Sequence, residues 1–155
     1  MIKRPQKWFR RLMLRAPIWL YRTGLGWLLG NRFLLLNHIG RKSRLTRQTV
    51  LEVVRHDKET NMYIVASGWG EQSDWIQNIH HTPHVLIIIG RRRFEAIATP
   101  LDSERAQQEA YRYALDHPHI FRNLAKRLID QPLNGTDEDY RVFAEKIPFV
   151  AFNPR

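Results

Sequence analysis

Five short apolar segments between residues 32 and 100 constrain the fold of this chain most strongly. They read "RFLLLNHI", "TVLEVVRH", "NMYIVAS", "HVLIIIG" and "RFEAIATP". Each is rich in Val, Ile, Leu or Phe, and Gly, Pro, Asp or Asn separates them, which is typical of strands joined by turns. "GRRR", at residues 90–93, predicts a tight hairpin between the fourth and fifth strands. Because few helices intervene, the pattern predicts a mainly antiparallel sheet or a small barrel.

Helices are predicted around these strands. "QSDWIQNIHH" has Ser73 or Asp74 as its N-cap, and "DSERAQQEAYRYALDH" has Asp102 or Ser103. A shorter helix is expected over residues 121–129 and another in "GTDEDYRVFAEK", before a last strand in "PFVAFNP". The fold class is therefore α+β and mainly β, with about six mostly antiparallel strands, N-terminal helices and peripheral helices.

The first 30 residues form a basic amphipathic segment. "QKWFRRLMLR" and "PIWLYRTGLGWLLG" both place Trp and Leu at helical spacing among Arg and Lys. Such a helix either packs on the core with its basic face in water, or lies on an anionic membrane with its apolar face in lipid. Arginines interrupt the apolar residues too often for a secretion signal or a membrane span. We predict one domain over 1–155, with a helical segment over 1–30 and the barrel core over 31–155.

Charge is distributed unevenly along the chain. The net charge is +10, and no acidic residue precedes Glu52, whereas 12 of the 25 Lys and Arg residues do. An anionic partner is therefore expected to meet the first third of the protein. The chain has no cysteine, which excludes disulfides, thiol nucleophiles and cysteine-bound metals and fits a reducing cytosol.

Most familiar catalytic motifs are missing. The sequence lacks a Walker A loop, a G-x-G-x-x-G turn after a strand and a G-x-S-x-G elbow. His80, His81 and His84 are close in sequence, but adjacent residues on a helix point to different faces, so no metal site is predicted. No nucleic-acid motif is recognised either, although cations interleaved with tryptophans leave a nucleic-acid or membrane binding module as an alternative.

Two segments carry the candidate chemistry. In "HIGRKSRLTRQT", Gly40 permits a turn between strands, and Arg41, Lys42, Ser43 and Arg47 present donors suited to a phosphate or carboxylate. In "ASGWGEQSDWIQN", a strand leads into a glycine-rich loop and a helix N-terminus, where an anion or a polar ring edge could bind. Tryptophans in the second segment either stack on a planar ring or fill the core.

Three blocks resemble the deazaflavin-dependent nitroreductase family: "GRKSRLTRQTVLEVV", the stretch from "IVASGWGEQSDWIQN" to "RRRFEAIA", and the closing "IPFVAFNPR". The resemblance implies a split β-barrel that binds coenzyme F420, a deazaflavin whose side chain carries a phosphate and glutamates. It implies that the basic block grips this anionic chain and that the glycine-tryptophan block lines the ring. The implied cofactor-binding residues are Gly40, Arg41, Lys42, Ser43, Arg47, Thr49, Ser67, Gly68, Trp69, Gly70, Trp75 and Asn78. Arg44 stands where the family block usually has glycine.

The activity implied by this resemblance is hydride transfer from reduced F420 to a quinone, a nitroaromatic or a similar acceptor. Such a cofactor carries the chemistry, so the protein mainly orients ring and acceptor, and no catalytic residue is assigned. Ser67, or the backbone of residues 67–70, is the candidate donor to a ring carbonyl. Related split barrels leave FMN or haem as alternative cofactors. The expected location is cytoplasmic, with attachment to the inner face of the cell membrane through residues 1–30 as the alternative, and the oligomeric state is left open.

Overall fold

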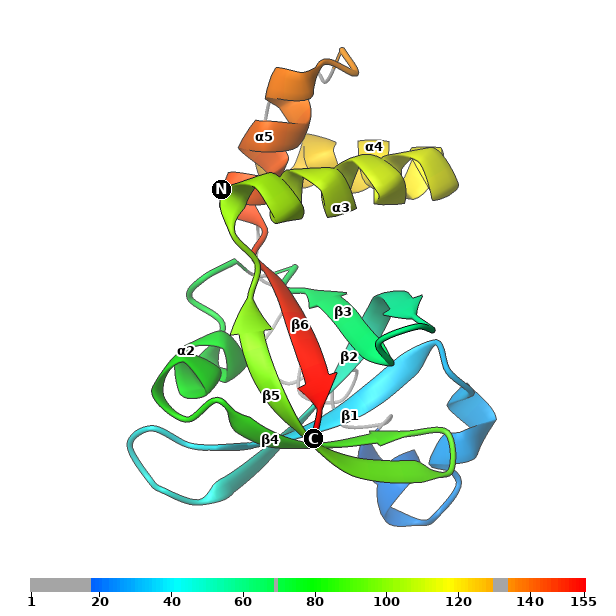
Figure 1. Ribbon diagram of the computed structural model, residues 1–155, viewed down its shortest axis with the longest axis vertical. Coiled ribbons are helices and arrows are strands. Elements are labelled where there is room, and N and C mark those ends of the chain that lie inside the picture. The colour runs from blue at the N-terminus through cyan, green and yellow to red at the C-terminus, as the bar shows by residue number, and fades with distance from the viewer. Residues whose placement is uncertain (1–17, 69, 130–133) are drawn as a thin grey trace.

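Six antiparallel strands close into a barrel in a computed structural model, which describes residues 18–68, 70–129 and 134–155 (Figure 1). Their order around the barrel is β1–β2–β3–β6–β5–β4. The strands are β1 Phe33–Ile39, β2 Thr46–Asp57, β3 Met62–Ala66, β4 His84–Ile89, β5 Arg92–Pro100 and β6 Phe149–Pro154. The predicted mainly-β fold with about six antiparallel strands is confirmed, including the tight β4–β5 hairpin, in which Ile89 pairs with Arg92.

Alternate residues of each strand fill the barrel interior. Leu34 and Leu36 of β1, Val85 and Ile87 of β4 and their counterparts on the other strands form one buried cluster. Helix α2, Asp74–His81, adds Trp75, Ile76 and Ile79 to the same cluster. Burial of this apolar face therefore holds α2 against the barrel, and Ser73 is its N-cap, as predicted.

A second layer of three helices covers one part of the barrel wall (Figure 1). It consists of α3 Ser103–Asp116, α4 Pro118–Ile129 and α5 Asp137–Lys146, and its core is separate from the barrel interior. Asp102 caps α3, as predicted, and at α5 Thr136 forms a capping box with Asp139. Helix α4 begins three residues earlier than predicted, because Pro118 occupies a first-turn position that proline tolerates.

A β-bulge in β2 fixes how the helical layer attaches to the barrel. The register shifts between Val53 and Arg55, so Val54 and Arg55 both lie on the side of the sheet that faces the helices. Arg55 donates from Nε and Nη2 to the carboxylate of Glu109 on α3, at 3.0 and 2.7 Å. Glu109 is buried, and its hydrogen bonds raise the pKa of Arg55. This ion pair anchors α3 to the barrel.

The N-terminal segment packs on β1 and β2. Residues 18–22 are helical, and a short 3₁₀ helix, η1, spans Gly26–Leu29. The helix expected over residues 17–30 ends early because Gly24 adopts a φ of 78°. The Tyr21 hydroxyl donates to the Phe33 carbonyl at 3.0 Å, and Arg22 donates to Gln48. The helix predicted in residues 6–15 lies outside the described residues, as does most of the proposed segment 1–30.

Candidate functional site

The β1–β2 turn holds the predicted basic block in a closed loop. The backbone N–H of Gly40 donates to the Leu45 carbonyl at 2.8 Å, and the N–H of Arg44 donates to the Gly40 carbonyl at 2.8 Å. A Cβ at position 40 would stand 2.6 Å from Oγ of Ser43 and 3.3 Å from the Leu45 carbonyl oxygen, so a side chain there would require the Ser43 side chain to move. Arg44 has a φ of 60°, the conformation that favours glycine, so the turn keeps this geometry with arginine in that place.

Arg41 joins this loop to α2. Its backbone N–H and its Nη1 both donate to Oδ1 of Asn78, each at 3.0 Å. Nη1 also lies 3.2 Å from Oδ1 of Asp74 in the first turn of α2. The other end of the Asn78 amide group, Nδ2, lies 3.0 Å from Nδ1 of His38. The side chains of His38 and Asn78 are both buried, so this network fixes the base of the basic loop.

Ser67 joins the glycine-rich loop to the same helix. Its Oγ lies 3.0 Å from the Gly70 carbonyl and 2.7 Å from Oγ of Ser73, the residue before α2. A carbonyl only accepts, so Ser67 donates its single hydroxyl proton to Gly70, and Ser73 donates to Ser67. Ser67 is also 1% exposed, and the backbone N–H groups of Ser67 and Gly70 donate to the carbonyls of Pro148 and Ser67 at 2.9 and 3.0 Å. Among the described residues of this loop, the geometry therefore favours the backbone N–H of Gly68 over the Ser67 hydroxyl as a donor to a ring.

The two predicted segments therefore meet at the N-terminus of α2. Arg41 of the basic loop contacts Asp74, and Ser67 of the glycine-rich loop contacts Ser73. Residues 73 and 74 are neighbours in the chain, with Cα atoms about 3.8 Å apart. A helix N-terminus carries unpaired N–H groups and a partial positive charge, so it adds to the attraction that the basic loop exerts on an anion.

The remaining predicted residues differ in what they offer. Gly68 is exposed, and a Cβ built on it meets no atom within 4 Å, so open space lies beside it. Trp75 is 7% exposed within the barrel core, as expected of a core-filling tryptophan. Thr49 pairs with Leu36 in the β1–β2 register, close to the basic loop. Trp69 lies outside the described residues.

Two residues of the site were not predicted from the sequence, His38 and Asp74. His38 precedes the basic block directly, and it is the cross-strand partner of Arg47. Its place in β1 could have indicated that it is buried. Leu34 and Leu36 point to the core, and alternate residues of a strand share one face, so residue 38 points the same way. Asp74 was predicted only as a possible helix cap.

Burial lowers the pKa of His38 to about 4, opposed by Asp74 and reinforced by Arg47. In the unfolded chain the same imidazole takes up a proton near pH 6.5, so the unfolded state binds more protons between these values. Stability should therefore fall by roughly 3 kcal/mol as the pH drops from above 6.5 to 4. Urea unfolding at a series of pH values should show this slope, and His38→Gln should flatten it. An equal slope in both proteins would contradict the assignment.

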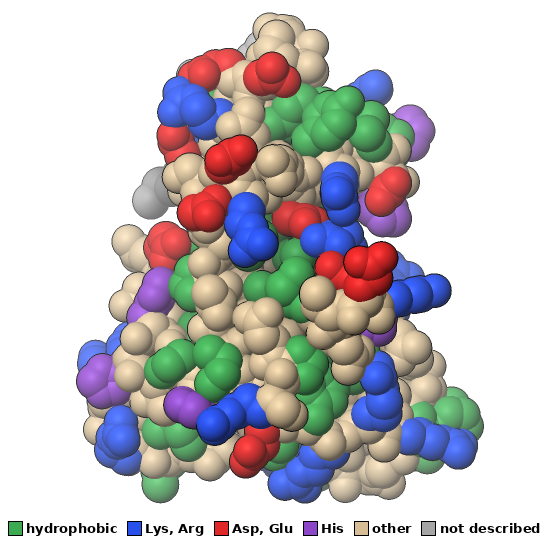
Figure 2. All heavy atoms as spheres, in the orientation of Figure 1, with side chains coloured by type: hydrophobic (Ala, Val, Ile, Leu, Met, Phe, Trp, Pro, Cys, Tyr) green, Lys and Arg blue, Asp and Glu red, His purple; other side chains and the backbone are tan. Residues whose placement is uncertain are grey.

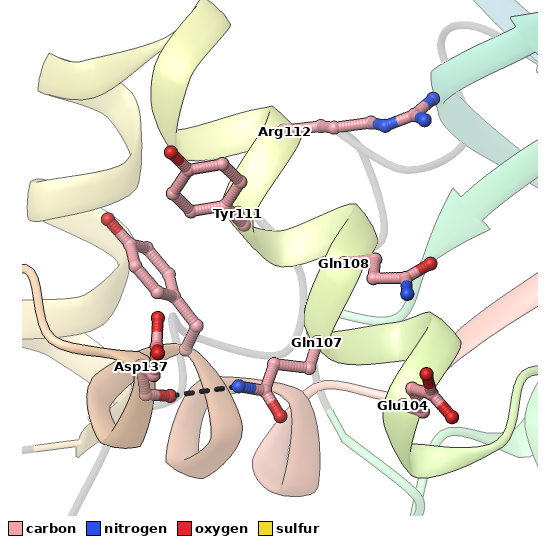
Figure 3. A pocket seen from close by; sticks show the side chains of 7 residues that line it. Glu104, Gln107, Gln108, Tyr111, Arg112 and Asp137 are labelled. Atoms are coloured by element: carbon pink, nitrogen blue, oxygen red, sulfur yellow. Dashed lines mark hydrogen bonds between the residues drawn. The ribbon is translucent and has the colours of Figure 1, made fainter.

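A separate groove of about 440 Å³ lies between α3 and α5 (Figure 3). The side chains that line it are Glu104, Gln107, Gln108, Tyr111, Arg112, Asp137 and Tyr140. Gln107 donates to the Asp137 carbonyl at 3.1 Å across it. Lys146, at the other end of α5, is the residue whose carbonyl approaches Gly70. Tyr140 and Lys146 are six positions apart on the helix, a rise of about 9 Å, so the groove is distinct from the glycine-rich loop.

Charge also differs between the two layers. On the face drawn in Figure 2, acidic side chains gather mainly over the helical layer, and Lys and Arg side chains are prominent at the lower end of the barrel. Within the described residues, no three His, Cys, Asp or Glu side chains come together as a metal site. None of the helices in this part of the chain has the length and apolar character to cross a bilayer.

The fold and this site define a class of protein: a split β-barrel in which a basic turn and a glycine-rich loop meet at one helix N-terminus. Residues 13–127 match the family model described as F420H(2)-dependent quinone reductase. This match covers most of the chain, and the protein belongs to that family. A search of curated protein sequences finds no significant match.

Solved structures agree on the fold. An F420-H2-dependent reductase is 17% identical, with a TM-score of 0.53 over 80% of this chain and 96% of that one. A chain solved as a domain-swapped dimer is 18% identical, with a TM-score of 0.57 over 97% and 100%. The haem storage protein HutZ of Vibrio cholerae is 14% identical, with a TM-score of 0.54 over 88% and 90%. At these identities the likeness concerns the fold alone.

Proposed function

We propose that this protein is an F420H2-dependent oxidoreductase that passes a hydride to a quinone or a similar activated acceptor such as a nitroaromatic. Family membership supports the cofactor class and the type of acceptor. The observation that carries the proposal on this chain is the meeting of the basic loop and the glycine-rich loop at residues 73 and 74. A flat ring with an anionic side chain needs such a pair of neighbouring surfaces.

The residues present fit this cofactor. Arg41, Lys42 and Arg47 would hold its phosphate and carboxylates, because guanidinium and ammonium groups pair with both. Lys42 and Arg47 are exposed, and Arg41 is partly exposed. The open space beside Gly68 would receive the ring, with the backbone N–H of Gly68 as the candidate donor to a ring carbonyl. Bound F420H2 would supply the hydride. The protein's contribution is then to orient ring and acceptor within about 3–3.5 Å of each other.

In this proposal, Trp75 and Asn78 do not contact the ring directly. Trp75 would form the packed floor on which the N-terminus of α2 rests, since it lies in the barrel core. Asn78 would act through Arg41, to which it is hydrogen-bonded. Gly40 and Ser43 would shape the basic loop, and Thr49 would lie at its β2 end.

Removing the loop cations should weaken cofactor binding. In Lys42→Ala/Arg47→Ala we expect the dissociation constant for F420 to rise roughly tenfold to a hundredfold, since each charge-assisted contact contributes about 1.5–3 kcal/mol when desolvated and less when exposed. Quenching of F420 fluorescence measures this. Lys58→Ala, which removes an exposed cation from the β2–β3 turn, is the matched control. Equal affinity in both variants would place the anionic chain elsewhere.

The absorption spectrum of the purified protein tests the alternative cofactors. FMN and haem are coloured and would be visible in the protein as isolated, whereas we expect tight binding only for added F420. A binding module for nucleic acid is the other alternative, and a DNA titration at physiological salt separates it, because purely electrostatic binding weakens steeply with salt.

Membrane attachment is a second part of the proposal, favoured by one surface. Trp19, Leu25, Trp27 and Leu28 are 44–59% exposed next to Arg22, whose guanidinium lies 5.6 Å from the Trp19 ring. Exposed Trp and Leu among cations suit the interface of an anionic bilayer. We therefore propose a cytoplasmic protein that meets lipid-dissolved quinone at the membrane surface.

Vesicle co-sedimentation tests this attachment. With vesicles containing phosphatidylserine, Trp27→Ala/Leu28→Ser should lower the bound fraction several-fold, because two apolar side chains no longer enter the interface. Leu115→Ser, which removes an equally exposed leucine from α3, should bind as the unchanged protein does. Equal loss in both variants, or no binding of the unchanged protein, would contradict the proposal.

A further inference from the structure

His38 and Asn78 are buried polar residues directly behind the basic loop. Each is 4% exposed. Resting on the proposed function of Arg41 as an anion ligand, we propose that His38 and Asn78 are positioning residues that hold Arg41 ready for the anionic part of the ligand. We propose with them that Asp74 is the exchangeable carboxylate that the ligand's anion replaces.

The direction of the hydrogen bonds supports the positioning role. Arg41 offers only donors, so the atom of Asn78 that faces its backbone N–H and Nη1 must be the oxygen, at 3.0 Å from each. The amide nitrogen of Asn78 must then donate to Nδ1 of His38, which is a neutral acceptor with its proton on Nε2. If His38 offered a donor instead, the Asn78 amide would turn and set its NH2 group against two donors of Arg41.

Both ends of Arg41 are thereby fixed at once. One oxygen of Asn78 holds the start of its backbone and the end of its side chain, which removes freedom that a ligand would otherwise have to order. Among the described residues, both side-chain contacts of Arg41 use Nη1. The guanidinium has five N–H donors, so an anion that replaces Asp74 at Nη1 can also accept from Nη2, in the planar, paired geometry that arginine provides.

Asp74 occupies the place of a ligand carboxylate. Its side chain is 86% exposed, and Oδ1 lies 3.2 Å from Nη1 of Arg41. An ion pair this open to water is weak, so a phosphate or a glutamate carboxylate can displace it at little cost. Asp74 also repels such an anion at the N-terminus of α2. Without Asp74, the positive end of the helix dipole would attract the anion there. Asp74 therefore sets how strongly an anion must bind before it replaces the carboxylate of Asp74 at Arg41.

A double-mutant cycle on the full chain tests the positioning role, with F420 fluorescence as the readout. Arg41→Ala and Asn78→Ala should each weaken F420 roughly tenfold, and the double variant should be no worse than Arg41→Ala alone, because Asn78 acts through Arg41. Losses that multiply would mean that Asn78 meets the ligand directly, which would overturn the inference. His81→Ala, at the exposed end of α2, is the control.

If Asn78→Ala does not fold, the F420 affinities of two other variants, His38→Leu and His38→Gln, test the positioning role. Glutamine supplies an acceptor to the Asn78 amide and leucine does not, so we expect His38→Gln to restore most of the affinity that His38→Leu loses. Equal affinity in these two variants would overturn the positioning role. Asp74→Asn should tighten F420 binding several-fold, and weaker or unchanged binding would overturn the exchange.

Inorganic phosphate separates this inference from the proposed function. Titrated into labelled protein, phosphate should shift the NMR signal of the Arg41 backbone amide, and it should do so weakly in His38→Leu. A phosphate response without any F420 binding would sink the proposed function and leave the positioning role standing. A response equal in His38→Leu and the unchanged protein would overturn the positioning role.

Discussion

Gly68→Val is expected to weaken F420 binding at least about a hundredfold without unfolding the protein. A Cβ at Gly68 meets no atom within 4 Å, and the residue has no left-handed φ, so the folded chain accepts a side chain there. The open space that the valine fills is the space we assign to the ring, and overlap with a rigid ring cannot be relieved. A loss of about 2.7 kcal/mol of binding free energy corresponds to this hundredfold change.

Fluorescence titration with F420 and thermal unfolding of the same samples measure this effect. Gly68→Ala, which adds one methyl group, should show a smaller loss. The melting temperature should stay within a few degrees of that of the unchanged protein, because replacing glycine at a compatible position changes stability by only about 0.4–1 kcal/mol. If Gly68→Val binds F420 as tightly as the unchanged protein, the ring lies elsewhere.

Glu109→Ala should lower the free energy of unfolding by about 3 kcal/mol, the largest loss of stability that we expect from a single substitution. The variant leaves the guanidinium of Arg55 between β2 and α3 without the carboxylate that accepts two of its hydrogen bonds. Breaking a buried pair by removing one partner costs about 3–5 kcal/mol, and Arg55 is partly exposed, so we expect the lower end of this range. For a domain of this size, the melting temperature should fall by roughly 6–12 °C.

Glu138→Ala is the control for this effect. Glu138 also pairs with an arginine, Arg141, but on the exposed surface of α5, where solvent screening leaves such pairs little effect on stability. Urea unfolding of both variants compares the two losses directly. A similar loss in the two proteins would mean that the Arg55–Glu109 pair does not anchor α3.

The sequence predicted the strands and helices well because local signals and tertiary structure agree here. Alternating apolar residues match the barrel interior, and the capping residues Asp102 and Thr136 lie where helices begin. The early end of the N-terminal helix depended on the conformation of Gly24, which can continue or end a helix. The β2 bulge depended on pairing with β3, so no local pattern contained it.

The candidate site was predictable as two segments but not as one place. The basic loop and the glycine-rich loop are each visible as residue types, yet their meeting depends on how α2 packs against the barrel. His38 and Asn78 are 40 residues apart and became a pair only through that packing. The Ser67 hydroxyl looked available from the sequence, and only its contacts with Gly70 and Ser73 indicate that its proton is engaged.

Strands β3 and β6 serve both hydrophobic cores at once. Val65 and Val150 point into the barrel, while their neighbours Ile64 and Ala151 face the helical layer. Strand β4 differs, because only alternate residues are fully buried. Mutational tolerance should therefore be uneven around the barrel: polar replacements can accumulate at every second position of β4, whereas β3 and β6 have almost no position at which sequence drift is neutral.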